Sequence, residues 1–270
     1  MARLTVRHRT RYAYSTPARY SVQSLRLTPP RFDGQRVISW TVSAPGIQRA
    51  LIFTDAFDNQ VHQLTVTGAH DEIEVEAAGT VETEDRNGVV SGLPESVPLR
   101  VYLRQTPRTE PDAAMRALAG AVRGDGIIAQ LHDLMARVRD AVDYEIGATH
   151  ARTGAAQALA DGRGVCQDHA HIFISAARIR GIPARYVTGY LLVEHEVRSS
   201  AQHAWAEARV DGLGWLGFDV ANRICPTQQY VRLACGLDSC YAAPVRGFTR
   251  GGDGESLDVQ VEVQQQSAQQ

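Results

Sequence analysis

Three residues far apart in the chain have the side chains that acyl transfer through a thiol requires. Cys166 follows the glycine-rich turn at residues 162–164 and opens an apolar stretch that predicts a helix. A thiol at a helix N-terminus lies near unpaired backbone N–H groups and the positive end of the helix dipole, which stabilise its thiolate. The thiolate is the nucleophilic form of cysteine, so this position suits attack on a carbonyl carbon.

His203 and Asp219 follow Cys166 in an order that suits a base and the group that orients it. On a predicted strand over residues 201–210, His203 shares one face with Trp205 and Glu207, while three alanines share the other face. We expect the alanine face to pack on the helix of Cys166, and Asp219 to end the neighbouring strand beside the His203 ring. General acid–base help of this kind contributes about 10²–10⁴-fold to a rate.

Each of these three residues also has a purely structural interpretation. A single cysteine is more often inert packing, a strand histidine a hydrogen-bonded core residue, and a strand-end aspartate a turn cap. Their occurrence together, in this order and on these predicted elements, favours the catalytic interpretation.

Composition and charge place the chain in a broad class. The 270 residues are 44% hydrophobic and 21% charged, which is typical of a globular protein with a sizeable core. The formal net charge of −2 gives no indication of binding to nucleic acid or to an anionic membrane. The first residues lack the apolar stretch of a secretory signal, and no run approaches the roughly 18 apolar residues of a membrane span. We therefore expect a cytoplasmic protein.

Cysteine usage gives little support for disulfides or a metal site. Four cysteines in 270 residues are sparse, and Cys225, Cys235 and Cys240 lack the CxxC spacing of zinc ligands. We interpret these three as small apolar residues, with a redox pair of Cys235 and Cys240 as an unsupported alternative. A metal site built from Cys166, His169 and His171 is disfavoured because the three positions do not share one helix face.

The elements that must position the three residues fall into two regions, one rich in strands and one with both helices and strands. The sequence therefore predicts an α+β protein. Residues 1–105 contain β-rich runs with period-two alternation and turn residues between them, which predicts an antiparallel β domain. Prolines and glycines make residues 86–110 the predicted linker. Residues 106–270 form the second domain, with helices predicted at 110–122, 126–142 and 166–179. Strands are predicted at 184–193, 201–210, 214–219 and 257–263.

Four segments carry a family resemblance. Residues 164–170 (GVCQDHA), 181–190 (GIPARYVTGY), 203–207 (HAWAE) and 214–219 (GWLGFD) are similar to motifs of the bacterial branch of the transglutaminase-like superfamily. The resemblance implies a papain-like cysteine-protease core, with a central helix packed on an antiparallel sheet, after a β-rich N-terminal region. It implies that Cys166 is the nucleophile, His203 the general base and acid, and Asp219 the orienting carboxylate. No cofactor and no metal are implied.

The resemblance also implies a reaction. Cys166 would attack an amide carbonyl to give a thioester acyl-enzyme, which water resolves in a protease or amidase and an amine in a transglutaminase. Relatives in the bacterial branch are often described as cysteine proteases, which favours hydrolysis slightly. The expected partner is a peptide or protein substrate, with no nucleic acid and no membrane, and the sequence leaves the oligomeric state open.

Further candidate residues surround this set. Papain-type enzymes have an oxyanion glutamine six residues before the cysteine, but that position here is Ala160. One oxyanion donor is the backbone N–H of Cys166, and Tyr144 is the candidate for the second. Asp168 and His169 are expected to form supporting hydrogen bonds, and Trp205 and Trp215 are candidates for lining a substrate cleft. For Tyr144 and both tryptophans, packing in the core is the alternative.

A different class of function stays open at this point. The same fold could serve as a catalytically silent module that binds a protein or peptide, with the β domain recognising the partner. The presence of Cys166, His203 and Asp219 together counts against this alternative, because a silent module needs none of them.

Overall fold

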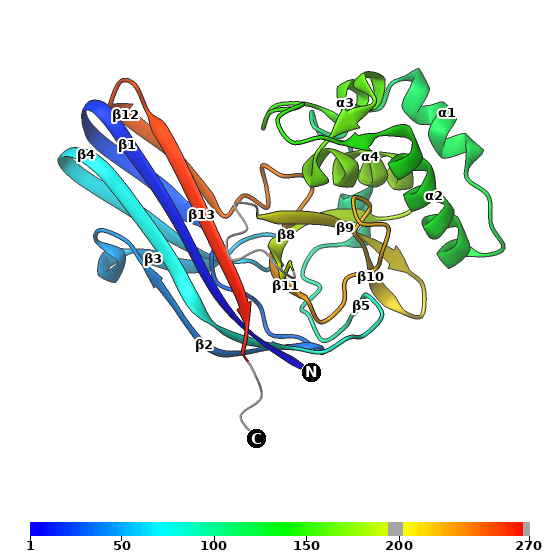
Figure 1. Ribbon diagram of the computed structural model, residues 1–270, viewed down its shortest axis with the longest axis horizontal. Coiled ribbons are helices and arrows are strands. Elements are labelled where there is room, and N and C mark those ends of the chain that lie inside the picture. The colour runs from blue at the N-terminus through cyan, green and yellow to red at the C-terminus, as the bar shows by residue number, and fades with distance from the viewer. Residues whose placement is uncertain (194–201, 267–270) are drawn as a thin grey trace.

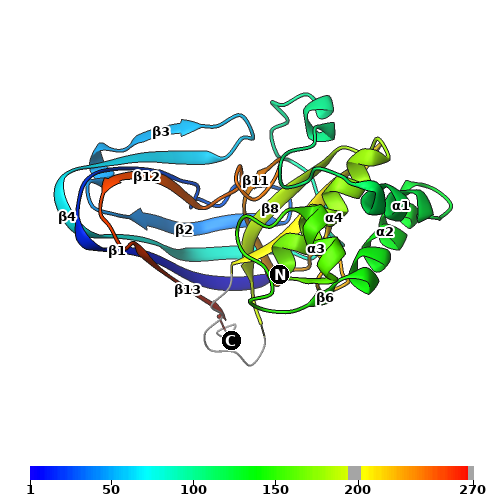
Figure 2. The same ribbon diagram turned by 90° about the horizontal axis from the view of Figure 1, so that it is seen from above.

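The computed structural model describes residues 1–193 and 202–266, which fold into two sheets and a layer of helices (Figure 1). The first sheet and the helices lie at opposite ends of the molecule, with the second sheet between them (Figures 1 and 2). The predicted α+β class is therefore confirmed. Within the described residues, none of the helices has the length and apolar character needed to cross a membrane.

The first sheet is built on two long antiparallel strands. It contains β1 (Ala2–Leu25), β2 (Gln35–Ser43), β3 (Leu51–Thr54), β4 (Gln60–Thr83), β12 (Val245–Gly251) and β13 (Ser256–Gln265). The register of β1 against β4 shifts between Ala13 and Tyr20, and across this irregularity β1 exchanges its neighbour β13 for β12. The sequence predicted separate shorter strands here. A bulge bends a strand without ending it, which is why one strand replaces them.

Alternation along β1 gives the first sheet a charged face and an apolar face. Arginines at exposed positions pair with glutamates of β4, as Arg7 does with Glu76 at 2.8 Å. Leu4 and Val6 lie on the other face and are fully buried. Their core includes Tyr190 and other side chains from the second sheet, so the two sheets share one apolar layer.

The second sheet carries His203 on β9 and ends its strand β10 at the residue before Asp219. Its strand order is β11 (Tyr230–Gly236), β8 (Ala184–Leu191), β9 (His203–Val210), β10 (Gly214–Phe218) and β5 (Val89–Val90). A short parallel pair, β6 (Asp143–Tyr144) and β7 (Arg163–Gly164), precedes the helix of Cys166. The alanines of β9 pack in one core with that helix, as predicted from the alternation.

The helices cover one face of the second sheet. They are α1 (Ala113–Ala121), α2 (Ile127–Ala141), α3 (Ala155–Asp161) and α4 (Cys166–Ile179). Of the two 3-10 turns, η1 (Ile47–Arg49) contacts β4 of the first sheet and η2 (Leu99–Leu103) contacts α4 and β8. Asp112 caps α1 by accepting a hydrogen bond from Met115 N at 2.8 Å. The predicted helices α1, α2 and α4 are confirmed. The seven-residue α3 was not predicted, because a helix so short has little periodicity to detect.

The two sheets do not follow the sequence boundary at residue 105. Strands β12 and β13, which lie within the predicted second domain, pair with β1 of the first sheet. Strand β5, which lies within the predicted linker, pairs with β10 of the second sheet. The predicted strand at 257–263 exists, but its neighbours come from the opposite end of the chain. Pairing over such a distance leaves no local trace in the sequence.

Candidate active site

Cys166 is the first residue of α4 and is 8% exposed. The helix start is held by Asp168, whose Oδ2 accepts a hydrogen bond from the backbone N–H of Val165 at 2.8 Å. A Cβ on Gly164 would lie only 2.8 Å from the Cβ of Asp168, so this position requires glycine. The glycine-rich turn therefore lets the capping carboxylate approach closely enough to fix the backbone that carries the thiol.

His203 and Asp219 form a buried pair at the neighbouring strands. His203 Nε2 donates a hydrogen bond to Asp219 Oδ2 at 2.6 Å, and the Asp219 side chain is fully buried. The same carboxylate oxygen accepts hydrogen bonds from Tyr230 Oη at 2.6 Å and from Asn222 Nδ2 at 2.7 Å. With three donors, the carboxylate has a fixed orientation and in turn fixes the imidazole ring.

The surroundings of His203 favour its charged form. Burial alone would lower the pKa of His203, but hydrogen bonds to Asp219 and to Cys166, together with their negative charges, outweigh burial and raise it to about 10. Burial would raise the pKa of Asp219, yet the hydrogen bonds and positive charge of His203 hold it below its ordinary value. The charged forms of both side chains, imidazolium and carboxylate, are therefore favoured, and the Cys166 sulfur is close enough to His203 to contribute to this effect.

The hydrogen bond to Asp219 also determines which ring nitrogen faces the thiol. Because Nε2 is directed at Asp219, Nδ1 is the nitrogen left to contact Cys166. A proton on Nδ1 can stabilise a thiolate or pass to a leaving group. The structure thus brings together the three side chains that the sequence singled out, in an arrangement that can support thiolate chemistry.

Asp168 and His169 act on the backbone around Cys166 and not on the thiol itself. Asp168 Oδ2 accepts a second hydrogen bond from Thr149 Oγ1 at 2.6 Å, which fastens the loop after β6 to the helix start. The ring nitrogens of His169 lie 2.9 Å from the carbonyl oxygen of Val165 and 3.0 Å from that of Val142. Both side chains are fully buried, in keeping with the supporting hydrogen bonds that were expected.

Tyr144 pairs with Gly164, which lies two residues before Cys166. Its side chain is 42% exposed, and its ring stacks on His169 with centroids 6.2 Å apart. The pKa of Tyr144 is raised by partial burial and by the negative charges of Cys166 and Asp219, which places its phenol within their electrostatic reach. A protonated phenol here can donate a hydrogen bond, as an oxyanion donor must.

The two tryptophans pack in the interior, each only 2% exposed. Trp205 stacks on His203 with centroids 6.3 Å apart and contacts Tyr230 edge-on, so it supports the base. Trp215 lies against Tyr102 on the sheet face opposite α4. Trp215, a sequence candidate for lining a cleft, packs instead in the core with Tyr102 and Leu237.

Sequence reasoning missed three residues at this site: Tyr230, Asn222 and Thr149. Tyr230 comes from β11, a strand that was not predicted. Asn222 follows Asp219 by three residues in the turn closed by the Asp219–Ile224 bridge, so an asparagine in a turn was the one signal available. Thr149 had no signal, because only the tertiary fold brings its loop to α4.

The remaining thiols and acids form no metal centre. Across residues 1–193 and 202–266, no three His, Cys, Asp or Glu side chains group closely enough to hold a metal ion. Cys166, Cys225, Cys235 and Cys240 are all free thiols. Cys235 is buried in β11, in keeping with its interpretation as a small apolar residue.

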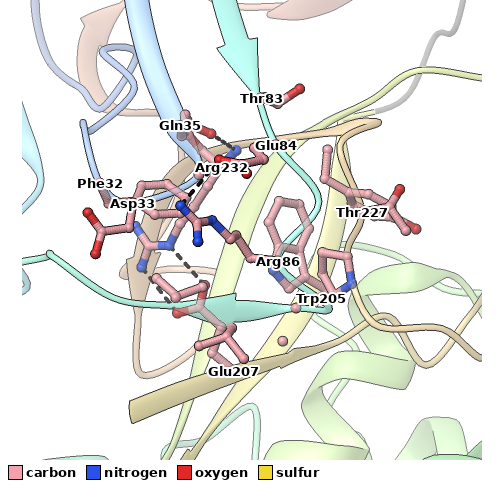
Figure 3. Close-up of a pocket in the computed structure, with 17 residues that line it drawn as sticks. Phe32, Asp33, Gln35, Thr83, Glu84, Arg86, Trp205, Glu207, Thr227 and Arg232 are labelled. Carbon is pink, nitrogen blue, oxygen red and sulfur yellow. Dashed lines mark hydrogen bonds and ion pairs between the residues drawn. The ribbon is translucent and has the colours of Figure 1, made fainter. Parts of the chain in front are cut away.

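A second feature of the site region lies between the two sheets. Figure 3 shows Arg232 between Gln35 of the first sheet and Glu207 of the second, with hydrogen bonds to both. Gln35 also donates from Nε2 to the Arg232 carbonyl oxygen at 2.9 Å, so one side chain satisfies both backbone groups of Arg232. The cavity drawn there has a volume of only about 40 Å³, which suits water and not an organic ligand.

Comparisons with known proteins agree with this architecture. The family model of the transglutaminase-like superfamily matches residues 116–220, which include Cys166, His203 and Asp219. The model of the bacterial transglutaminase-like N-terminal region matches residues 4–82. The predicted order of a β-rich region followed by a transglutaminase-like core is therefore found by independent models.

Relatives and solved structures match over nearly the whole chain. An uncharacterized protein of Mycobacterium leprae is 31% identical, covering 97% of this chain and 99% of the relative. An uncharacterized protein of Mycobacterium bovis is 27% identical, and the match covers 97% of this chain and 92% of the relative. A crystal structure from Cytophaga hutchinsonii, described as a "putative cysteine protease", has a TM-score of 0.79 at 21% identity. The match covers 99% of this chain and 92% of that protein.

The two kinds of match carry different weight. At 21% identity, the crystal structure shows a common fold. The family model of the transglutaminase-like superfamily supports a thiol enzyme at the level of the family. The chain therefore belongs to the transglutaminase-like superfamily.

Proposed function

We propose that this protein is an acyl-transfer enzyme in which Cys166 attacks the carbonyl carbon of a peptide or isopeptide amide. The observation that carries the proposal is the buried His203–Asp219 hydrogen bond of 2.6 Å, with the Cys166 sulfur close enough to His203 to help raise its pKa. His203 is the general base and acid, and Asp219 is the carboxylate that orients it.

In the first half of the reaction the thiolate forms a C–S bond and the carbonyl electron pair moves to oxygen. The backbone N–H of Cys166 and the phenol of Tyr144 are the proposed donors to this oxyanion. When the tetrahedral intermediate collapses, the C–N bond breaks and the His203 imidazolium gives its proton to the departing amine. The product is a thioester on Cys166 and a neutral imidazole.

In the second half, neutral His203 takes a proton from the acceptor as the acceptor attacks the thioester. Water gives a carboxylic acid, and an amine gives a new amide. The C–S bond then breaks, and the thiolate–imidazolium pair is restored. We propose hydrolysis as the main outcome, with the amine as the alternative acceptor.

The first experiment asks whether Cys166 is the reactive thiol. Labelling with iodoacetamide near neutral pH, read by peptide mass spectrometry, should modify Cys166 ahead of the other cysteines, and His203→Ala should slow it. Cys225 is the internal comparison, because burial and the charge of Asp85 raise the pKa of its thiol. Slow labelling of all four cysteines at similar rates would favour a silent binding module.

The second experiment identifies the reaction. A library of quenched peptides reports hydrolysis, and a glutamine-containing protein with a labelled primary amine reports amine transfer. Cys166→Ala should abolish both activities while leaving the thermal midpoint nearly unchanged, and Cys225→Ala should retain both. Full turnover in Cys166→Ala would refute the mechanism.

A further inference from the structure

A larger cavity lies on the face of the second sheet that turns away from α4 and Cys166. Its volume is about 360 Å³, within the range of small-molecule sites. Its walls come from residues 28–31 and 57–60 of the first sheet's loops, from residues 93–94, and from strands β8 and β11. Segments that are remote in sequence therefore enclose one space at the junction of the sheets.

Two buried arginines line this cavity and share one acid. Arg185 and Arg232 are 3% and 4% exposed. Arg185 Nε donates to Glu207 Oε2 at 2.6 Å, and Arg232 Nε donates to Glu207 Oε1 at 2.9 Å. Burial would raise the pKa of Glu207, but the two arginines outweigh it and lower the pKa to about 2. The cluster thus holds two positive charges and one negative charge.

The other charged side chains on the walls do not remove this excess. Among the described residues, the remaining lining groups with a formal charge are Arg31 and Asp58, which are opposite in sign and more exposed. Asp55, close in sequence to Asp58, is already paired with Arg26 at 2.7 Å. A buried charge without a counter-charge is unfavourable, so the cluster favours a bound anion.

The Arg185 guanidinium is already held in place. The guanidinium is fixed by Glu207 through Nε and by the Trp215 ring, whose centroid lies 4.0 Å from Cζ. Donors that are already oriented bind a ligand without further loss of side-chain freedom.

We propose that this cavity binds the carboxylate of a small organic acid, with Arg185 and Arg232 contacting the carboxylate and the apolar walls enclosing the hydrocarbon part. A planar carboxylate matches the fork of a guanidinium, and Glu207 already shows a carboxylate held by these two arginines. One negative charge balances the single positive excess, whereas a phosphate dianion would overbalance it. Phe57, Leu93 and Leu233 supply apolar wall for the body of the acid.

The proposal is independent of the chemistry at Cys166. The cavity and the thiol lie on opposite faces of the second sheet, and binding of the acid involves no covalent step. The test can therefore be made with Cys166→Ala protein, so its result does not depend on whether the chain is an active enzyme.

The test compares a carboxylate with its uncharged analogue. Calorimetric titration at low salt uses phenylbutyrate and phenylbutyramide, which differ only in the charged group. We expect phenylbutyrate to bind with a Kd below about 1 mM and the amide to bind at least about tenfold more weakly. Equal binding of the two compounds, or no binding of the carboxylate at millimolar concentration, would overturn the proposal.

Three variants locate the binding. Arg185→Met leaves Arg232 and Glu207 as a balanced pair, so we expect it to fold and to lose about tenfold or more in phenylbutyrate affinity. Leu93→Trp narrows the cavity without altering its charge and should weaken the binding of both compounds. Arg31→Gln, at the exposed edge, should change the Kd by less than about threefold. Wild-type affinity in both Arg185→Met and Leu93→Trp would show that the acid binds elsewhere, and circular dichroism melts verify that each variant is folded.

Discussion

The side-chain nitrogen Nε2 of Gln202 lies 3.1 Å from Nε2 of His8, so the first sheet contacts the residue that directly precedes His203. His8 is fully buried on β1, and its Nδ1 lies 3.0 Å from the Tyr190 hydroxyl of β8. One imidazole therefore connects the N-terminal sheet to two strands of the second sheet, at the point where β9 begins. The N-terminal sheet is in this way packed against the segment that carries His203.

This contact predicts a loss of stability in acid. Burial lowers the pKa of His8 to about 4, whereas an unfolded chain has the ordinary histidine value of about 6.5. Between these values the unfolded state binds a proton that the folded state excludes, so the free energy of unfolding falls as the pH decreases from about 6.5 to 4. For His8 the full loss is about 3 kcal/mol.

Urea unfolding at pH 7 and at pH 4.5 measures this loss, with His8→Gln as the variant that cannot titrate. His171, also fully buried with a pKa lowered to about 3, contributes a loss of the same sign in both proteins. The difference between the proteins therefore isolates His8. An identical pH dependence in wild type and His8→Gln would contradict the assignment.

Asp219→Asn should shift the titration of His203. The carboxylate is the strongest of the influences that raise the pKa of His203 to about 10, and asparagine keeps the position while removing the charge. We expect the His203 pKa to fall by at least about one unit, so the alkaline limit of turnover moves to lower pH. NMR titration of the His203 ring measures this directly, and the pH profile of kcat provides the second readout.

Asn222→Ala is the matched control for this prediction. It removes one hydrogen bond to Asp219 and leaves the carboxylate charge in place, so the His203 pKa should change much less than in Asp219→Asn. A larger shift in Asn222→Ala than in Asp219→Asn would show that orientation, and not charge, controls the imidazole.

Glu207→Gln should be strongly destabilising. The change removes the one anion shared by Arg185 and Arg232 and leaves two buried guanidinium groups without a counter-charge. Breaking a buried pair in this way costs about 3–5 kcal/mol. Chemical denaturation measures the loss of stability. Glu95→Gln provides the comparison, because Glu95 forms an exposed ion pair with Arg209, which lies on the same strand as Glu207, β9. We expect Glu95→Gln to lower the free energy of unfolding by less than about 1 kcal/mol. A similarly small loss in Glu207→Gln would contradict the charge balance described above.

Tyr144→Phe tests the second oxyanion donor. Removal of one such donor lowers kcat by about 10²–10³-fold, and KM should change little because the contact forms in the transition state. The ring and its stacking on His169 remain, so stability should be unaffected. Tyr241→Phe is the control, because Tyr241 is equally exposed at 42% and has no assigned contact with the site. Wild-type kcat in Tyr144→Phe would exclude the phenol as the donor.

Local patterns explain why much of the second region was predictable. Helical periodicity predicted α1, α2 and α4, and period-two alternation placed His203 on the strand face opposite the alanines. These signals arise within a few residues and depend on burial of one face. The glycine at 164 is a local signal of the same kind, since it permits the close approach of Asp168 to the helix start.

Long-range pairing explains what was missed. The sequence contains turn-like residues near position 16 of β1, but pairing with β4 on one side and with β12 and β13 on the other carries the strand through them. Tyr230 was missed as a ligand of Asp219 because no local pattern connects a tyrosine on β11 to a carboxylate at the end of β10.

The sequence by itself predicted helices α1, α2 and α4 and strands β8, β9, β10 and β13, and it singled out the thiol, imidazole and carboxylate, because periodicity and motif are local properties. Only the tertiary structure decided what surrounds these groups: the three donors on Asp219, the His8 contact beside His203, and the arginine-lined cavity between the sheets. Apart from Asn222, which comes from the same turn as Asp219, each depends on segments that meet only after the chain has closed its long-range pairings. The energy of such contacts depends on distance in space, which the order of residues does not specify.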